Sequence, residues 1–195
     1  VTLSFTEGFY SKPRVDLELL EKYHEGLFCL SGCLGGYIPQ CILAGDMTGA
    51  EEYARRLSAL FGKEHFYLEI QNHAMEEERT VRDNLLLLSQ KTGIPLVATG
   101  DVHYLKKTDA RMQAVLLCIQ TGNVLRDGKP FGFQTDEYDY KSTEEMERLF
   151  AAYPEAIANT VRIAERCHFD FKYEMLHLPT FKVQNGTPQD CLRRY

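Results

Sequence analysis

Asp101 and His103 stand two positions apart in the stretch VATGDVHYL, directly after an apolar run. On an extended segment, side chains two residues apart point to the same side, so this pair can aim a carboxylate and an imidazole at one point. Such a pair suits metal ligation or acid/base chemistry. It equally suits a strand end whose two polar side chains face water, and the spacing alone leaves both interpretations open.

Polar residues also follow two other apolar runs of the chain. Cys33 closes the stretch LSGC, and Glu69 and His73 lie in EIQNH, where they could be ligands, a general base or parts of a helix entrance. Together with Asp101 and His103, the thiol of Cys33 offers sulfur, oxygen and nitrogen donors. This mixture suits zinc, and the carboxylate and imidazole suit manganese or iron as well. Each residue alone has an ordinary structural interpretation, as a buried thiol, a turn former or a hydrogen-bonded ring.

These residues must be positioned by an alternating series of strands and helices. Apolar runs typical of buried strands end at about residues 31, 71 and 99, and helical periodicity over 47–62 and 75–93 predicts the helices between them. Strand, helix, strand, helix, strand predicts parallel βαβ units in an α/β layer or barrel. In such folds functional side chains collect at the carboxyl ends of the strands, where all three polar features fall. The acidic run Glu76 to Glu78 is interpreted as the solvated first turn of a helix.

The remaining segments read as helices and irregular connections. Further helices are expected within 15–26, 108–122, 142–153 and 154–167, while 131–142 and 168–186 lack a helical period.

Composition narrows the class of protein. The 195 residues are enough for one substantial hydrophobic core. The net charge of −6 has the wrong sign for binding nucleic acid by electrostatic attraction alone. Six cysteines without a CxxC pair or a secretory signal indicate reduced thiols in a cytoplasmic protein. No apolar run approaches the roughly 20 residues of a membrane-spanning helix. Because the chain begins without Met and stops near a helix start, we expect a segment of a longer protein.

Several motifs in a fixed order carry a more specific signal. GFYSKPRVD, LSGCLGG, FYLEIQNH and GIPLVATGDVHYL are followed by PEAIANTVRIAERC and LPTF. In this order they resemble the bacterial DNA polymerase III alpha subunits, in the later part of the polymerase-and-histidinol-phosphatase (PHP) domain. The resemblance covers nearly the whole chain. It implies an α/β fold, namely part of a PHP-type distorted β/α barrel with parallel strands over residues 1–140, and a helical and extended connector over 141–195 that leads toward the polymerase core.

The resemblance also implies a metal site. By position in the motifs, Cys33, Asp101 and His103 match metal ligands of the family, with Asp101 and His103 at the catalytic centre, whereas His73 matches a histidine without a ligand role. Zinc or manganese is expected there, and magnesium at a polymerase site outside this chain. Relatives usually carry Asn where Gly100 stands here, which removes a hydrogen-bonding group and adds backbone freedom. The family's opening His-x-His element and its other ligands would lie upstream.

The implied function is therefore that of a part of the replicative DNA-directed DNA polymerase. Its PHP region would contribute to 3'-to-5' exonuclease or phosphoesterase chemistry in the whole protein, and the chain alone would be inactive. No Asp-x-Asp pair for nucleotidyl transfer occurs in the chain, so it cannot synthesise DNA itself. Expected partners are DNA, the sliding clamp, the clamp loader and a separate exonuclease subunit. Two alternatives are a stand-alone PHP phosphoesterase and a PHP region kept as a non-catalytic structural and docking module.

Overall fold

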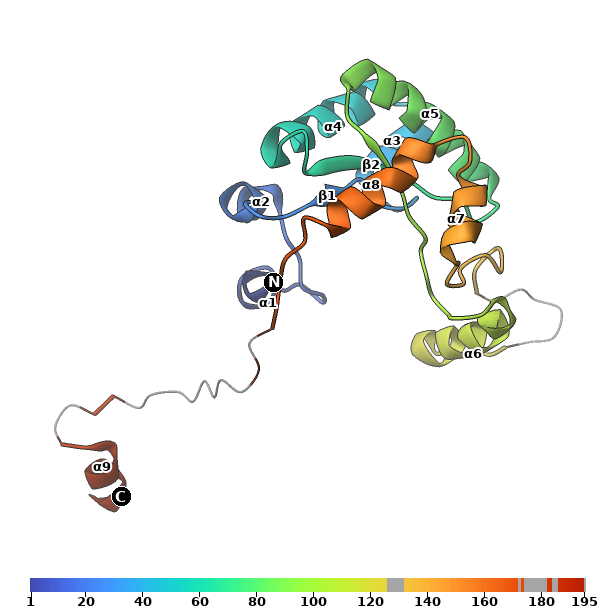
Figure 1. The fold of residues 1–195 in the computed structure, drawn as a ribbon. Coiled ribbons are helices and arrows are strands. Elements are labelled where there is room, and N and C mark those ends of the chain that lie inside the picture. Colours follow the sequence, from blue (N-terminus) through green and yellow to red (C-terminus); the bar gives the residue numbers. More distant parts are fainter. Residues whose placement is uncertain (126–131, 172, 174–181, 184–185, 195) are drawn as a thin grey trace.

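The computed structural model describes residues 1–125, 132–171, 173, 182–183 and 186–194 (Figure 1). Helices dominate around a small parallel sheet. In chain order the elements are α1 (Thr2–Thr6), α2 (Leu17–Tyr23), β1 (Cys29–Leu30), α3 (Tyr37–Leu43), α4 (Met47–Phe61), β2 (Phe66–Ile70), α5 (Glu76–Thr92), β3 (Leu96–Ala98), the 3-10 helix η1 (Lys107–Asp109), α6 (Ala110–Thr121), α7 (Thr143–Leu149), α8 (Pro154–Ala164) and α9 (Pro188–Arg194).

The sheet has the order β1-β2-β3, and both strand pairs are parallel. Cys29 pairs with Phe66 in the first ladder, and Glu69 pairs with Val97 in the second. Parallel neighbours require a crossover, which α3 and α4 supply after β1 and α5 supplies after β2. The predicted α/β fold with parallel strands is therefore confirmed.

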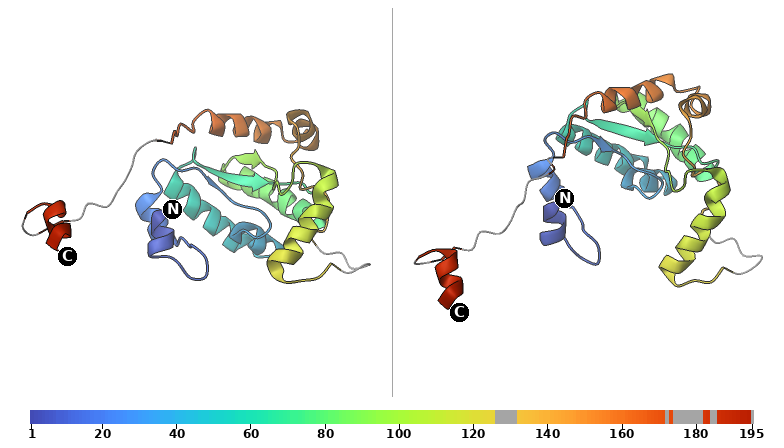
Figure 2. Two further views of the ribbon diagram at one scale, coloured as in Figure 1. Left: turned by 90° about the horizontal axis from the view of Figure 1, so that it is seen from below. Right: turned by 60° about the horizontal axis from the view of Figure 1, so that its bottom comes forward.

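Helices cover both faces of this sheet. Figures 1 and 2 show α3, α4 and α5 on one face and α8 on the other. Phe66, Leu68 and Ile70 of β2 are all 1% exposed or less and pack with Leu85 of α5 and Ala54 of α4. Burial on both faces explains why the strands read as continuous apolar runs rather than as an alternation of apolar and polar residues.

Local signals fix the ends of the longer helices. The Asp46 carboxylate accepts a hydrogen bond from the Gly49 backbone at the start of α4 (2.8 Å), a standard N-cap. Gly93 ends α5 in the left-handed conformation (φ +71°), where a side chain would be strained. The predicted helices over 47–62 and 75–93 are confirmed, whereas α1 and α3 were not expected from the sequence.

The segment after residue 140 begins with two helices, of which α8 packs against β3 and α7 packs against α8. Phe150 and Ala156 are 1% exposed within the main core, and the Asn159 amide donates to the Leu96 carbonyl oxygen of β3 (2.7 Å). The helices expected within 142–153 and 154–167 are thus confirmed as α7 and α8. The predicted extended connector falls largely on residues outside those described, and so does its LPTF motif. A division between domains at residue 140 stays a prediction.

Within the described part of the chain, no helix is both long enough and apolar enough to span a lipid bilayer.

Candidate metal centre

Three loops leave the carboxyl ends of the three strands at one edge of the sheet. They contain residues 31–33 after β1, 71–73 after β2 and 99–103 after β3. Hydrogen bonds join them directly: Glu69 at the end of β2 binds the first loop and the third loop, and His73 binds the third. The edge predicted from the order of elements is therefore the place where the polar residues gather.

Asp101 and His103 lie side by side on the third loop. Asp101 Oδ1 and His103 Nε2 are 3.2 Å apart, and the two side chains are 39% and 34% exposed. Two ligands at about 2.1 Å from a tetrahedral zinc ion are roughly 3.4 Å apart, so this separation suits two donors of one ion. Their exposure leaves both donors open to an ion or a substrate from solvent.

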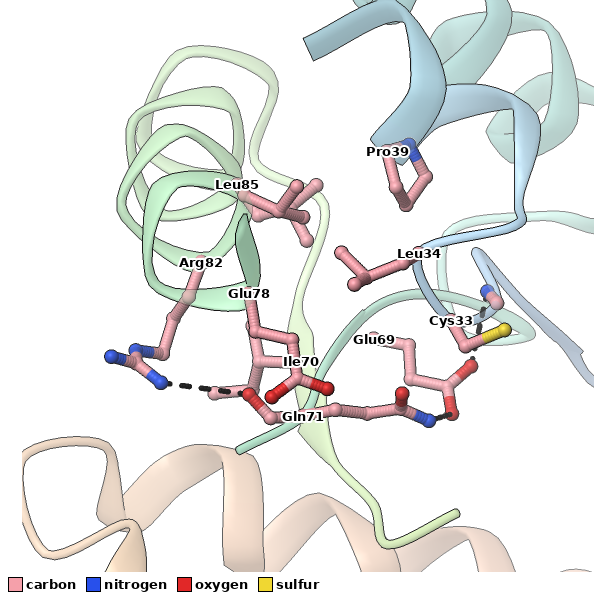
Figure 3. Close-up of a pocket in the computed structure, with 11 residues that line it drawn as sticks. Cys33, Leu34, Pro39, Glu69, Ile70, Gln71, Glu78, Arg82 and Leu85 are labelled. Carbon is pink, nitrogen blue, oxygen red and sulfur yellow. Dashed lines mark hydrogen bonds between the residues drawn. The ribbon is translucent and has the colours of Figure 1, made fainter. Parts of the chain in front are cut away.

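Cys33 lies on the first loop and is exposed. Figure 3 shows its side chain beside the Glu69 carboxylate, in the lining of a pocket that also includes Glu78. Over the residues that the structure describes, no three His, Cys, Asp or Glu side chains are close enough together to hold a metal ion. The structure brings Asp101 and His103 together and places the loop of Cys33 at the same edge, but it does not bring the three donors into one coordination sphere.

A second cysteine near this edge is a poor ligand. Cys29 is half-buried in β1, and burial, together with the nearby Glu69 charge, raises the pKa of its thiol to about 11. It therefore stays protonated at neutral pH, and only the thiolate binds metals well. Of the two cysteines in this run, Cys33 is the one whose position suits metal binding.

Glu69 has a structural role at this edge. Its Oε2 accepts from the Gly32 backbone (3.0 Å), and its Oε1 accepts from the Gln71 amide (3.1 Å) and the Thr99 hydroxyl. Both carboxylate oxygens are thus occupied by donors from three segments. Of the two sequence interpretations of Glu69, ligand or structural residue, the hydrogen bonds favour the structural one, because they hold the first and third loops against β2.

Both ring nitrogens of His73 also take part in hydrogen bonds. It is 3% exposed, its Nδ1 lies 2.6 Å from Glu78 Oε1, and its Nε2 accepts from the Asp101 backbone N–H (3.2 Å). Because Nε2 accepts, the ring proton sits on Nδ1 and is donated to the carboxylate. This arrangement agrees with the sequence-based expectation that His73 is not a ligand.

Glu78 corrects one sequence-based expectation. Glu76 and Glu77 are exposed, as expected of a solvated first turn, but Glu78 is only 4% exposed. The first turn of α5 runs against the second loop, so Glu78 faces inward and accepts from both the ring and the backbone N–H of His73. These two donors compensate the cost of burying a carboxylate.

An aromatic stack covers the site on the side of residues 132–140. The Tyr138 ring stacks on His73 (centroids 4.3 Å apart, planes at 5°) and on Phe133 (4.2 Å), and Phe133 also contacts His103 (4.4 Å). Burial, together with the charges of Glu78, Asp101 and Cys33, raises the pKa of Tyr138 to about 12. The sequence predicted an aromatic, irregular segment here but gave no indication that it packs on the two histidines.

Gly100 is not required by the backbone. Its φ lies outside the left-handed region, and an added Cβ would meet only Val102 Cγ2 at 3.8 Å. The loop therefore has room for the asparagine expected of the family, and the glycine here reflects no steric demand.

Comparison with known proteins shows which proteins this chain resembles. The model of the PHP domain matches residues 1–73, which include Cys33 but not Asp101 or His103. The DNA polymerase III subunit alpha of Treponema pallidum (strain Nichols) is 45% identical over 180 residues, which are 92% of this chain and 15% of the relative. The corresponding subunits of Borreliella burgdorferi and Thermus aquaticus are 44% and 40% identical over 88% and 94% of this chain, again 15% of each relative.

The chain thus spans about 15% of the length of these relatives. The match runs through the sheet, the candidate metal centre and the helices that follow. The resemblance expected from the ordered motifs is confirmed: over most of its length this chain is similar to one PHP-containing segment of the bacterial DNA polymerase III alpha subunits.

Proposed function

We propose that this chain is a segment of the alpha subunit of a bacterial DNA polymerase III, the DNA-directed DNA polymerase of replication. The similarity to several alpha subunits over 88–94% of the chain carries this proposal. Within it, residues 1–140 belong to the PHP domain and residues 141–195 form the connector toward the polymerase core. A stand-alone PHP phosphoesterase is less well supported, because the similarity continues beyond the sheet.

The PHP part of the segment contributes donors to a divalent metal site. Asp101 Oδ1 and His103 Nε2, 3.2 Å apart at the carboxyl edge of the sheet, are the observation that supports it. Cys33, exposed on the neighbouring loop, adds a thiolate for zinc, and manganese suits the carboxylate and imidazole. A bound ion would supply the charge that activates water and stabilises a phosphate during 3'-to-5' exonuclease or phosphoesterase chemistry.

In that chemistry, the residues of this chain position the substrate. Asp101 and His103 are open to solvent, so they can meet a phosphodiester at the edge of the sheet, while the buried stack behind them excludes water from one side. Because the described residues bring only two donors into contact, the chain alone is expected to show no exonuclease activity. It also lacks the Asp-x-Asp pair that nucleotidyl transfer with magnesium would need.

The expected partners follow from the same assignment. The whole protein would act on DNA in the cytoplasm, together with the sliding clamp, the clamp loader and a separate exonuclease subunit. The net charge of −6 on this segment means that DNA is held by other parts of the protein or at the metal site.

A second candidate function, a docking module without catalysis, is favoured by α6. Met112, Leu116 and Ile119 lie on one face of this helix and are 63%, 58% and 73% exposed. Figure 2 shows the helix standing away from the sheet. An apolar helix face of this kind is usually covered by other protein.

The two functions are separated by Asp101→Ala and His103→Ala variants of the full-length alpha subunit. Exonuclease catalysis predicts that both variants lose metal-dependent removal of a primer end while DNA synthesis continues. Unchanged primer digestion in both variants would exclude the catalytic assignment and leave the docking module. Leu116→Ser is the matched variant for the docking function. It removes apolar surface from α6 and leaves the metal donors in place.

A further inference from the structure

A buried pair of a histidine and a carboxylate, joined by hydrogen bonds, lies directly behind the candidate metal donors. His73 and Glu78 are 3% and 4% exposed, and both carboxylate oxygens of Glu78 bind His73, one its ring Nδ1 (2.6 Å) and the other its backbone N–H (2.5 Å). Figure 3 shows Glu78 on the first turn of α5 at the pocket beside Glu69 and Gln71. Neither residue reaches solvent, so neither can itself receive a substrate.

The second ring nitrogen of His73, Nε2, faces the backbone of Asp101. Nε2 accepts a hydrogen bond from the Asp101 N–H at 3.2 Å, which requires the ring proton to be on the Glu78 side. The carboxylate therefore selects the tautomer, and the tautomer makes Nε2 an acceptor. The hydrogen bond from His73 to Glu78 on α5 therefore determines the hydrogen bond that His73 accepts from the loop after β3.

The same ring also supports the second donor. Tyr138 stacks on His73 with the two rings nearly parallel, and its carbonyl oxygen accepts from the His103 N–H at 2.9 Å. The backbone amides of Asp101 and His103 are thus both bound, one by His73 and the other by the residue stacked on it. A loop anchored at two amides has little freedom to turn its side chains apart.

We infer that His73 is a positioning residue, which with Glu78 fixes the backbone of Asp101 so that the Asp101 and His103 donors face one point before an ion binds. The part of this inference that concerns metal affinity rests on the proposed metal site. Residues that orient metal ligands typically change metal affinity by about ten- to a hundredfold when removed. His73 acts on the backbone of the ligand rather than on its side chain.

Two substitutions of His73 separate positioning from simple core stability. Asparagine places an amide near the position of Nδ1, so His73→Asn keeps a donor for Glu78 and removes the acceptor for Asp101. Glutamine reaches to the position of Nε2, so His73→Gln keeps an acceptor for Asp101 and removes the donor for Glu78. Ser89→Ala is the control, because it removes a hydrogen bond to the Ile94 carbonyl (2.6 Å) at the far end of α5.

The experiment uses the full-length alpha subunit, with DNA synthesis as the check of folding. In metal-free protein, hydrogen exchange of a peptide covering residues 97–105 should be about two- to tenfold faster in His73→Asn, since one hydrogen bond is lost, and close to wild type in His73→Gln and Ser89→Ala. Titration with Mn²⁺ should show affinity about ten- to a hundredfold weaker in His73→Asn alone.

Two outcomes would overturn the inference: wild-type exchange in His73→Asn, or a greater effect in His73→Gln than in His73→Asn. If wild-type protein binds no Mn²⁺, the proposed metal site fails, and the exchange measurement in metal-free protein still decides whether His73 positions the loop.

Discussion

Replacing Glu69 by glutamine should loosen the edge of the sheet that carries the candidate metal centre. The carboxylate accepts hydrogen bonds from Gly32, Gln71 and Thr99, which belong to segments after all three strands. A hydrogen bond to a charged group contributes about 1.5–3 kcal/mol to stability. Glutamine has one acceptor oxygen and can keep the Gly32 contact while the Thr99 hydroxyl turns to accept, so we expect the variant to lose about 2 kcal/mol, the equivalent of one charged hydrogen bond.

The assay is urea unfolding of the 195-residue chain. With a denaturant slope of about 2 kcal/mol/M, the expected loss lowers the urea midpoint by roughly 1 M. Glu155→Gln is the matched control, because it neutralises a carboxylate whose side chain is 71% exposed and whose partner is Arg162, and exposed ion pairs contribute little. If Glu69→Gln shifts the midpoint no more than Glu155→Gln does, Glu69 does not hold the three loops together.

Three further predictions follow from the same residues. Gly100→Ala should raise the free energy of unfolding by about 0.4–1 kcal/mol, because the backbone there accepts a side chain. Gly36→Ala should instead destabilise the protein, because its Cβ would lie 2.5 Å from the Ser31 carbonyl oxygen. Equal effects of the two substitutions in urea unfolding would contradict this prediction. Iodoacetamide at pH 7.5 should modify Cys33 well before Cys29, because burial raises the pKa of Cys29 to about 11; mass spectrometry showing equal rates would count against it. Hydrogen bonding to Lys107 lowers the pKa of Glu137 below its ordinary 4.5. The contribution of Glu137 to protein stability is therefore complete above pH 4.5 and is lost as the pH falls through the lowered pKa. Glu137→Gln should make stability fall less steeply at acid pH, and an unchanged pH dependence would refute the assignment.

The fold was predictable where one signal dominates. Three buried strands separated by two amphipathic helices predicted the parallel sheet. The helical periodicity over 47–62 and 75–93 predicted helix ends close to those observed, where Asp46 caps the start of α4 and Gly93 the end of α5. α3 was missed because Pro39 and the preceding glycines read as a loop, yet Pro39 lies in the first turn of that helix, where proline is tolerated.

The candidate site was predictable only in part. Parallel topology placed Cys33, Asp101 and His103 at one edge, and the i, i+2 spacing matched the observed contact of Asp101 with His103. Glu78 could not be identified, because an acidic first turn looks the same whether one of its carboxylates faces water or a buried histidine. Tyr138 and Phe133 were equally hidden, since their contacts with the histidines join parts of the chain at least 30 residues apart.

The most direct test of the proposed metal centre is a crystal structure of the full-length alpha subunit grown with Mn²⁺, with anomalous scattering recorded at the manganese edge. We expect an anomalous peak in bonding contact with both Asp101 Oδ1 and His103 Nε2, roughly 2.0–2.3 Å from each, and no such peak in the Asp101→Ala variant. A map without a peak between these two side chains, at a Mn²⁺ concentration that supports DNA synthesis, would contradict it.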